Sequence, residues 1–244
     1  MNPKTVCHIL TVVFLVLPCL ALRADTVLAS HQGANDPLQE GFSLFMQRGI
    51  VGPLTNDFGR DAWTVFSSGA PVSYSRSLTA GDQNLLAGAD WSFSATLRLL
   101  RTPNVSMYFF SGTERFFVEF DQESDGDPIT HTRSSTRPVW VYSGGGSGYH
   151  DYQLQYHASS GVASLLVDGV ERVSDITGEP GWAWWGVIWG AYSQASHGSY
   201  SYWNTVTLSV IPEPASGTVL ALGALGLLLL RRPGAHQCSG QRHA

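Results

Sequence analysis

The stretch Trp91-Ser-Phe-Ser-Ala-Thr-Leu-Arg-Leu99 alternates apolar and polar residues at every position. A period of two is typical of a β-strand with one buried and one solvated face. Alternation or a β-rich composition recurs at 115–121, 138–142, 149–157, 162–167, 170–173, 186–192 and 202–210. No helical pattern of useful length separates these runs. Short strands without helices predict an all-β, two-sheet antiparallel sandwich.

Asp168-Gly169 is the clearest turn between these strands. A two-residue hairpin needs residues that tolerate positive φ angles, and aspartate followed by glycine meets this need. The dipeptide therefore predicts a hairpin between the runs 162–167 and 170–173. Ala158-Ser-Ser-Gly161 predicts the turn before it.

The segment from Tyr149 to Val210 resembles the paired strands of concanavalin A-like (laminin-G-like) jelly rolls. The resemblance is carried by Tyr149-His-Asp-Tyr-Gln-Leu-Gln-Tyr, by Leu165-Leu-Val-Asp-Gly, and by Tyr202-Trp-Asn-Thr-Val-Thr-Leu near the end. It implies a jelly-roll-like sandwich for the body, residues 25–210. Lectins, glycosidases and inert spacers all use this fold, so the fold alone selects no function.

The composition of the body limits its chemistry. All three cysteines of the chain, Cys7, Cys19 and Cys238, lie outside 25–210, so the body has no disulfide and no thiol chemistry. Its nine arginines oppose 18 aspartates and glutamates, which gives a net charge of −9. Nucleic acid is a poor partner for such an acidic domain. A neutral glycan, a cation or no specific ligand fits it better.

The C-terminal part contains Pro212-Glu213-Pro214, an uncharged apolar run over 215–230 and the pair Arg231-Arg232. The run predicts a short transmembrane helix with the arginines on the cytoplasmic side. Motif, run and basic pair together resemble the PEP-CTERM sorting signal of Gram-negative bacteria, here over 211–232. The resemblance implies cleavage near the motif by an exosortase and a link to exopolysaccharide and biofilm. Residues 233–244 would be a cytoplasmic extension.

The N-terminal part predicts a secretory signal peptide with a short apolar helix. Lys4 precedes the mostly apolar run from Val6 to Leu22, and small residues follow. Cleavage after Ala24 gives a signal peptide of 1–24, and cleavage after Ala29 would extend it. We therefore expect export, an inner-membrane stage with the body on the periplasmic side, and a final location at the cell surface or outside the cell.

An acidic segment is the best candidate for a metal site. Carboxylates at alternate positions, with a glycine for the bend, have the spacing of a Ca²⁺ loop. The segment is also similar to the metal loop of legume-type lectins, which implies a metal-facing set of Glu119, Asp121, Asp127 and His131, with Asp125 assisting. The alternative is a solvated acidic hairpin that turns at Asp125-Gly126. No other cofactor is expected.

Tryptophans are concentrated late in the body, where Trp182, Trp184, Trp185 and Trp189 fall within eight residues. Alternation places the first two on one face of a strand and the last two on the other. Exposed indoles would stack on sugar rings, whereas buried indoles would fill the sandwich.

The sequence favours an exported, membrane-tethered protein of the envelope or matrix that is structural or binds glycans, with exopolysaccharide as the candidate partner. The alternative is a glycoside hydrolase of the same fold. Glu119 and Asp121 project from one strand face about 7 Å apart, within the range that such enzymes need. No further glycosidase motif and no nucleophile motif supports this alternative, so a non-enzyme is expected.

Overall fold

A computed structural model describes residues 24–101, 105–122, 128–134, 137–141, 148–191 and 198–212. Residues Ala24–Pro212 form one compact unit. The predictions for 1–23, for the apolar run at 215–230 and for 233–244 lie outside the described residues, as do Glu213, Pro214, Arg231 and Arg232. Within the described ranges, no helix is long and apolar enough to cross a membrane.

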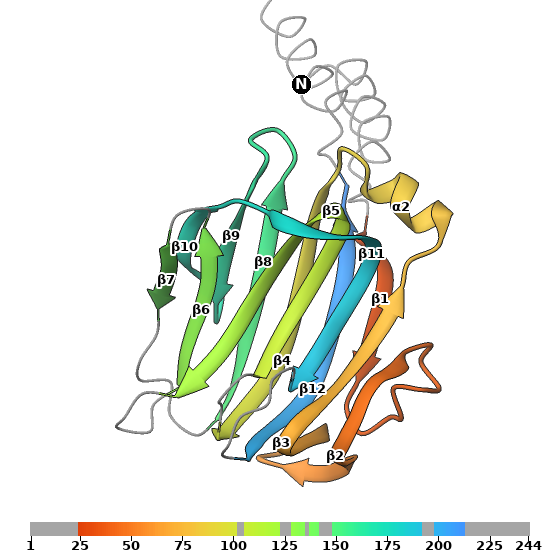
Figure 1. Cartoon of the computed structure of the whole chain (residues 1–244), viewed down its shortest axis with the longest axis vertical. Helices are drawn as coiled ribbons and strands as arrows, with labels where there is room; N and C mark the ends of the chain where they lie inside the picture. Colours follow the sequence, from red (N-terminus) through yellow and green to blue (C-terminus); the bar gives the residue numbers. More distant parts are fainter. Residues whose placement is uncertain are drawn as a thin grey trace, which may run out of the picture. The chain divides into compact units, whose positions relative to one another are not determined.

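The described residues form twelve strands and one short helix (Figure 1). The elements are β1 (Thr26–Gln32), β2 (Ser43–Asp57), β3 (Arg60–Ser77), α2 (Ala80–Leu86), β4 (Asp90–Arg101), β5 (Val105–Gln122), β6 (Pro128–Ser134), β7 (Arg137–Val141), β8 (Tyr149–His157), β9 (Val162–Val167), β10 (Val170–Ile176), β11 (Glu179–Ala191) and β12 (Ser199–Ile211).

The strands form two antiparallel sheets that share the long strand β3. The order β10-β9-β8-β4-β12 reaches β3 on one side, and β11-β5-β6-β7 continues from β3 on the other. Residues Trp63–Ser67 of β3 pair with β12, and residues Val72–Ser77 pair with β11. β1 pairs with β12, and β2 pairs with β3. The prediction of an all-β protein with two antiparallel sheets is confirmed. The finer resemblance to concanavalin A-like jelly rolls stays a prediction.

Aromatic side chains from the two sheets meet in the core. The ring of Trp91 on β4 lies 4.6 Å from that of Phe109 on β5, and Phe120 on β5 lies 4.7 Å from Tyr152 on β8. All four side chains are buried. Burial of side chains of this size contributes several kcal/mol each to folding, which a domain without disulfides requires.

The alternation that predicted the strands also predicted their faces. In β4, Phe93, Ala95 and Leu97 are buried in the core, as expected. The predicted hairpin at Asp168-Gly169 is confirmed, because Val167 pairs with Val170 and the two turn residues have φ angles of 51° and 74°. Both central residues of a type I′ turn have such positive φ angles.

The expectation that the body lacks helices is wrong at one place. α2 is only seven residues long, but a capping box begins it. The hydroxyl of Thr79 accepts a hydrogen bond from the backbone N–H of Asp82, and the carboxylate of Asp82 accepts one from the backbone N–H of Thr79. These two bonds satisfy donors that a short helix otherwise leaves free.

Strand β1 favours one of the two predicted signal-peptide cleavage sites, although cleavage itself stays a prediction. Leu28 and Ala29 are buried, and Thr26–Gln32 pair with β12. Cleavage after Ala24 leaves β1 whole, whereas cleavage after Ala29 removes its first half. We therefore expect Asp25 to be the first residue of the mature protein.

A chain beginning at Ser30 should be less stable than one beginning at Asp25. Loss of the Leu28 side chain alone costs about 2 kcal/mol of unfolding free energy. Urea unfolding of the two chains measures the difference, and N-terminal sequencing of the exported protein identifies the native start. A mature protein that begins at Ser30 and is equally stable would contradict the expectation.

Candidate functional site

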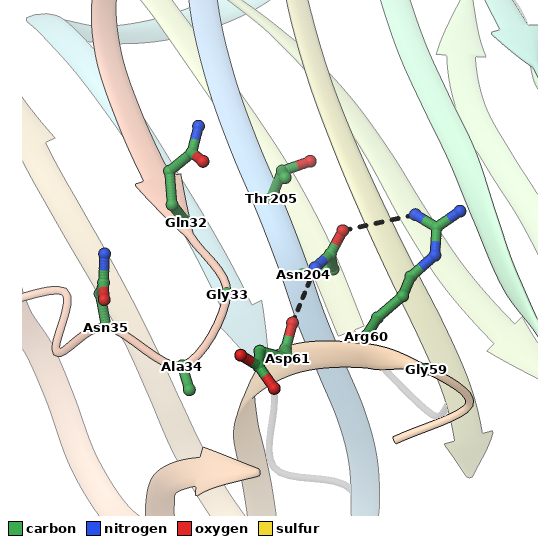
Figure 2. A pocket seen from close by; sticks show the side chains of 9 residues that line it. All are labelled: Gln32, Gly33, Ala34, Asn35, Gly59, Arg60, Asp61, Asn204 and Thr205. Carbon is green, nitrogen blue, oxygen red and sulfur yellow. Dashed lines mark hydrogen bonds between the residues drawn. The ribbon is translucent and has the colours of Figure 1, made fainter. Parts of the chain in front are cut away.

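An open pocket of about 630 Å³ lies where β1, β3 and β12 meet. We call it the polar pocket. It is lined by Gln32, Gly33, Ala34, Asn35, Gly59, Arg60, Asp61, Asn204 and Thr205 (Figure 2). Its walls therefore offer a guanidinium, three side-chain amides, a carboxylate and a hydroxyl.

Asn204 occupies the centre of this wall because β12 is irregular there. The register between β12 and β4 shifts between Trp203 and Thr205, which leaves Asn204 as the extra residue of a bulge. Its side-chain Nδ2 donates to the carbonyl of Asp61 at 2.7 Å, and its Oδ1 accepts from Arg60 Nη1 at 3.4 Å. Figure 2 shows Asn204 between these two residues.

The β1 side of the pocket is held by one carboxylate. Glu40 Oε1 accepts hydrogen bonds from the Asn35 side chain at 3.1 Å and from the backbone N–H of Gln32 at 3.2 Å. Glu40 Oε2 lies 2.6 Å from Nδ1 of His31, whose ring is fully buried and stacks on Trp189 at 4.9 Å. The rim of the pocket is thus connected to the core through Glu40 and His31.

The turn between β2 and β3, whose Gly59 lines the pocket, also carries an exposed aromatic residue, Phe58. Asp57 pairs with Arg60, so Phe58-Gly59 is a two-residue turn, with φ angles of 52° and 78°. Asparagine, aspartate or glycine normally occupies such positions. A phenylalanine with positive φ costs about 1–2 kcal/mol, yet the side chain of Phe58 is 68% exposed. The ring packs on one side against Arg98 and leaves most of its surface exposed.

The same turn is fastened to the sheet by a bidentate ion pair. Arg98 Nε and Nη2 each donate to the Asp57 carboxylate at 2.8 Å, and the Tyr149 hydroxyl donates to Asp57 at 2.9 Å. The guanidinium carbon of Arg98 lies 4.2 Å from the Tyr202 ring centroid and 4.9 Å from that of Phe58. Burial, and next the Asp57 carboxylate, raise the pKa of Tyr149, so its hydroxyl stays a donor.

The four predicted tryptophans have different surroundings. Trp182 is 51% exposed and stacks on Phe110 with a centroid distance of 5.4 Å. Trp184 is half-buried on the same face, tilted against Phe110, with its indole N–H donating to Ser77. Trp185 is half-buried against the core.

The predicted glycan contact at Trp189 is wrong. This indole is fully buried between the rings of Tyr74 and His31. The reason is its position on the face of β11 that turns toward the core, where it packs at the junction of the two sheets.

The predicted metal set is only partly described. Asp125 and Asp127 lie outside the described residues. Strand pairing places Glu119 opposite His131, and Glu119 accepts a hydrogen bond from the Tyr108 hydroxyl at 2.6 Å. Asp121 lies on β5, two residues beyond Glu119. The described part of the chain contains no group of three or more acidic, histidine or cysteine side chains able to hold a metal. The calcium site therefore stays a prediction.

The polar pocket and Phe58 were missed by the sequence analysis. Their residues come from three regions of the chain, near 32–35, 57–61 and 204–205, which the strand pairings of β1, β3 and β12 bring together. One local signal was present, since a glycine follows Phe58 between two β-rich runs.

The sequence matches no family model and no curated protein. The fold is similar to that of a carbohydrate esterase from the Shiga toxin-encoding bacteriophage phi24B, with a TM-score of 0.59 and 10% identity, over 78% of this chain and 100% of that chain. It is also similar to a sialidase, with a TM-score of 0.51 and 8% identity, over 75% of this chain and 19% of that chain.

A structure of botulinum neurotoxin type C, described as entering cells through interaction with two ganglioside molecules, matches with a TM-score of 0.50 and 10% identity. The match covers 82% of this chain and 51% of that chain, so this chain spans about half of it. At such identities the likeness shows the β-sandwich fold alone.

His31 should make stability depend on pH. Burial lowers the pKa of His31 below 6.5, despite the opposing effect of Glu40. The unfolded chain therefore takes up this proton first as the pH falls, and the free energy of unfolding should decrease below about pH 6.5, by at most about 1.4 kcal/mol per pH unit.

Urea unfolding at pH 7.5 and 5.5 tests this for the wild type and for His31→Gln. The variant should lose most of the pH dependence, whatever its stability at pH 7.5. His157→Gln, at a half-exposed histidine, is the matched control and should retain it. Equal pH dependence in the wild type and His31→Gln would contradict the assignment.

Proposed function

We propose that the polar pocket binds a saccharide and that the chain is a non-catalytic, glycan-binding protein of the cell envelope or extracellular matrix. One observation carries the proposal: a strained, exposed aromatic residue, Phe58, directly precedes Gly59 and Arg60, which line a pocket rich in amide and guanidinium groups. A pyranose presents hydroxyls that both donate and accept hydrogen bonds, together with an apolar C–H face. The pocket offers partners for the hydroxyls, and Phe58 offers a partner for the apolar face.

The balance of groups favours a neutral sugar. Arg60 supplies a positive charge, but Asp61 lies next to it in the chain, and Glu40 holds the opposite rim. The body as a whole carries a net charge of −9. An anionic ligand would be repelled at this surface, whereas hydroxyl groups suit its mixture of donors and acceptors.

The fastening of the turn supports binding by a preformed site. Phe58 lies in the turn and Arg60 follows it, and Asp57 ties this turn to Arg98 and Tyr149. The guanidinium of Arg60 also lies 5.6 Å from the centroid of the Tyr149 ring. Groups that are already ordered lose little conformational entropy when a ligand binds. The names of the similar structures concern saccharides in general, but the ganglioside and the sialidase substrate carry anionic sialic acid and do not match the neutral sugar favoured here.

Phe58→Asn should separate stability from binding. Asparagine relieves the positive φ angle, so the variant should be as stable as the wild type or about 1 kcal/mol more stable. Its affinity for the saccharide found on a glycan array should fall at least tenfold, which corresponds to about 1.4 kcal/mol. Leu85→Asn, at an exposed apolar residue on α2, is the matched control and should change affinity little.

Two outcomes, one from the binding assay and one from a hydrolysis assay, would contradict the proposal. Loss of binding in Trp182→Ala, with full binding in Phe58→Asn, would move the site to the stacked indole on β11. Release of new reducing ends that is lost in Glu119→Gln would make the protein a glycoside hydrolase, the alternative that the sequence left open.

We further propose that the protein is exported, held in the inner membrane by 215–230, and released by an exosortase near Pro212-Glu213-Pro214. The membrane-length apolar run, the motif before it and the basic pair after it support this order of events. The saccharide-binding role fits a destination outside the cytoplasm, where exopolysaccharide would be the partner.

The mass of the mature protein from fractionated cells tests this route. We expect both ends to be shortened, and alanines at residues 212–214 should leave a longer, membrane-bound species. The intact chain dissolved in the cytoplasm would contradict it.

A further inference from the structure

A second, smaller pocket of about 130 Å³ lies between the two sheets, beside the C-terminal end of α2. Figure 1 shows α2 at one end of the sandwich. We call this pocket the aromatic slot. The residues that matter for its chemistry are Trp91, Phe116, Tyr156, Trp185 and Glu114. None of them belongs to the polar pocket, so the slot is a separate site.

The rings of the slot are fixed by mutual packing. Trp91 and Tyr156 stack, with centroids 5.0 Å apart and planes 6° apart. Phe116 stands nearly perpendicular to both, 5.1 Å from Trp91 and 5.5 Å from Tyr156. Trp91 and Phe116 are buried and form the floor, whereas Tyr156 is half-buried. The slot is therefore preformed.

Trp185 forms a wall of the slot and depends on a glycine for its place. Gly112 has a φ angle of +77°, and a Cβ atom there would lie 3.1 Å from the indole Nε1 of Trp185. A side chain at residue 112 would strain the backbone and press on the indole. Gly112 thus lets β5 turn while the Trp185 ring lies directly against it.

The charges around the slot are negative. Glu114 lines it and is exposed, and no salt bridge to Glu114 forms within the described residues. Burial raises the pKa of Tyr156, and the carboxylates of Glu114 and Asp90 raise it further. His157 lies 3.5 Å from Asp90. The neighbouring Arg115 pairs with Glu179 and lies over the ring of Phe117, which belongs to a different cluster.

Aromatic rings next to a carboxylate attract an organic cation. The faces of indole and phenol rings carry negative partial charge, and a nearby carboxylate adds a full charge. A weakly hydrated alkylammonium group can interact with the rings and with the carboxylate at the same time. Its methyl groups contact the rings while its charge faces Glu114. A volume of about 130 Å³ suits one such headgroup and is too small for a sugar chain.

We infer that the aromatic slot binds an organic ammonium ion, with a trimethylammonium headgroup as the fitting class. The ligand enters beside Tyr156 and Trp185, the two half-buried rings, and its charge lies against Glu114. A ligand that also carries a carboxylate binds more weakly, because Glu114 repels it. This site stands whether or not the polar pocket binds a saccharide.

Titration of the folded protein with choline chloride tests the inference, with the Trp indole N–H resonances or calorimetry as the readout. We expect a dissociation constant on the order of 1 mM, which needs several partly desolvated cation–aromatic contacts together with the carboxylate of Glu114. The neutral isostere 3,3-dimethylbutan-1-ol should bind at least tenfold more weakly, and betaine should also bind more weakly than choline. Sodium chloride at equal concentration controls for ionic strength.

Two substitutions locate the site without disturbing the core. Glu114→Gln should weaken choline binding at least fivefold, whereas Glu171→Gln, at an exposed glutamate on β10, should leave it unchanged. Saccharide binding at the polar pocket should be the same in both variants. A wrong proposal for the aromatic slot can therefore be distinguished from a wrong proposal for the polar pocket.

Three results would each overturn the inference. Equal binding of choline and its neutral isostere would make the slot a merely apolar cavity. Equal weakening by Glu114→Gln and Glu171→Gln would make the effect one of overall charge. No change in the indole resonances at choline concentrations of about 100 mM, roughly a hundred times the expected dissociation constant, would mean that no site exists.

Discussion

The structure depends on the continuous pairing of β3 with both sheets. Its first half pairs with β12 and its second half with β11, and the hydroxyl of Ser67 bonds to the carbonyl of Ala70 between them. Because one strand belongs to both sheets, their separation at this edge is fixed by covalent bonds. At this place β11 and β3 approach each other closely. A Cβ atom at Gly190 would lie 2.6 Å from the Val72 carbonyl oxygen, so a side chain there would clash.

This junction explains why the largest aromatic side chains gather in one place. Trp63 and Tyr74 come from the two halves of β3, and Trp189 and Trp203 come from its partners β11 and β12. The indole N–H of Trp63 donates to the Tyr74 hydroxyl at 2.9 Å, which satisfies a polar group inside the core. Burial raises the pKa of Tyr74 to about 12, so the hydroxyl remains protonated. His31 packs on this cluster. Its hydrogen bond to Glu40 connects the cluster to the rim of the polar pocket.

The sequence predicted the strands that have a regular period or a clear turn beside them, and it missed β2 and β3. β4 and β8 alternate cleanly, and the turns at Gly161 and Asp168-Gly169 mark β9 and β10, so local rules were enough. β2 and β3 run through glycines, prolines and serines, and bends interrupt the period of two. Helix α2 depends on two side chains, Thr79 and Asp82, a signal that a search for apolar periodicity does not detect.

The candidate sites were less predictable than the strands, for a related reason. Trp182 and Trp189 belong to the same run, yet one is half-exposed and the other fully buried. Alternation placed them on opposite faces, but only the packing of the other sheet decides which face is covered. The polar pocket combines β1, β3 and the bulge at Asn204, and the aromatic slot combines β4, β5, β8 and β11. Such contacts between distant segments leave no periodic trace in a sequence.

The placement of the arginines links the fold to the kind of ligand. Arg98 is committed to Asp57, Arg115 to Glu179, and Arg76 to the carbonyl of Glu40 and the ring of Phe42. These positive charges stabilise internal contacts, so they do little to offset the acidic surface. Glu114 meanwhile remains exposed. A domain that uses its cations internally attracts neutral or cationic ligands at its openings, and both pockets have the side chains that such ligands need.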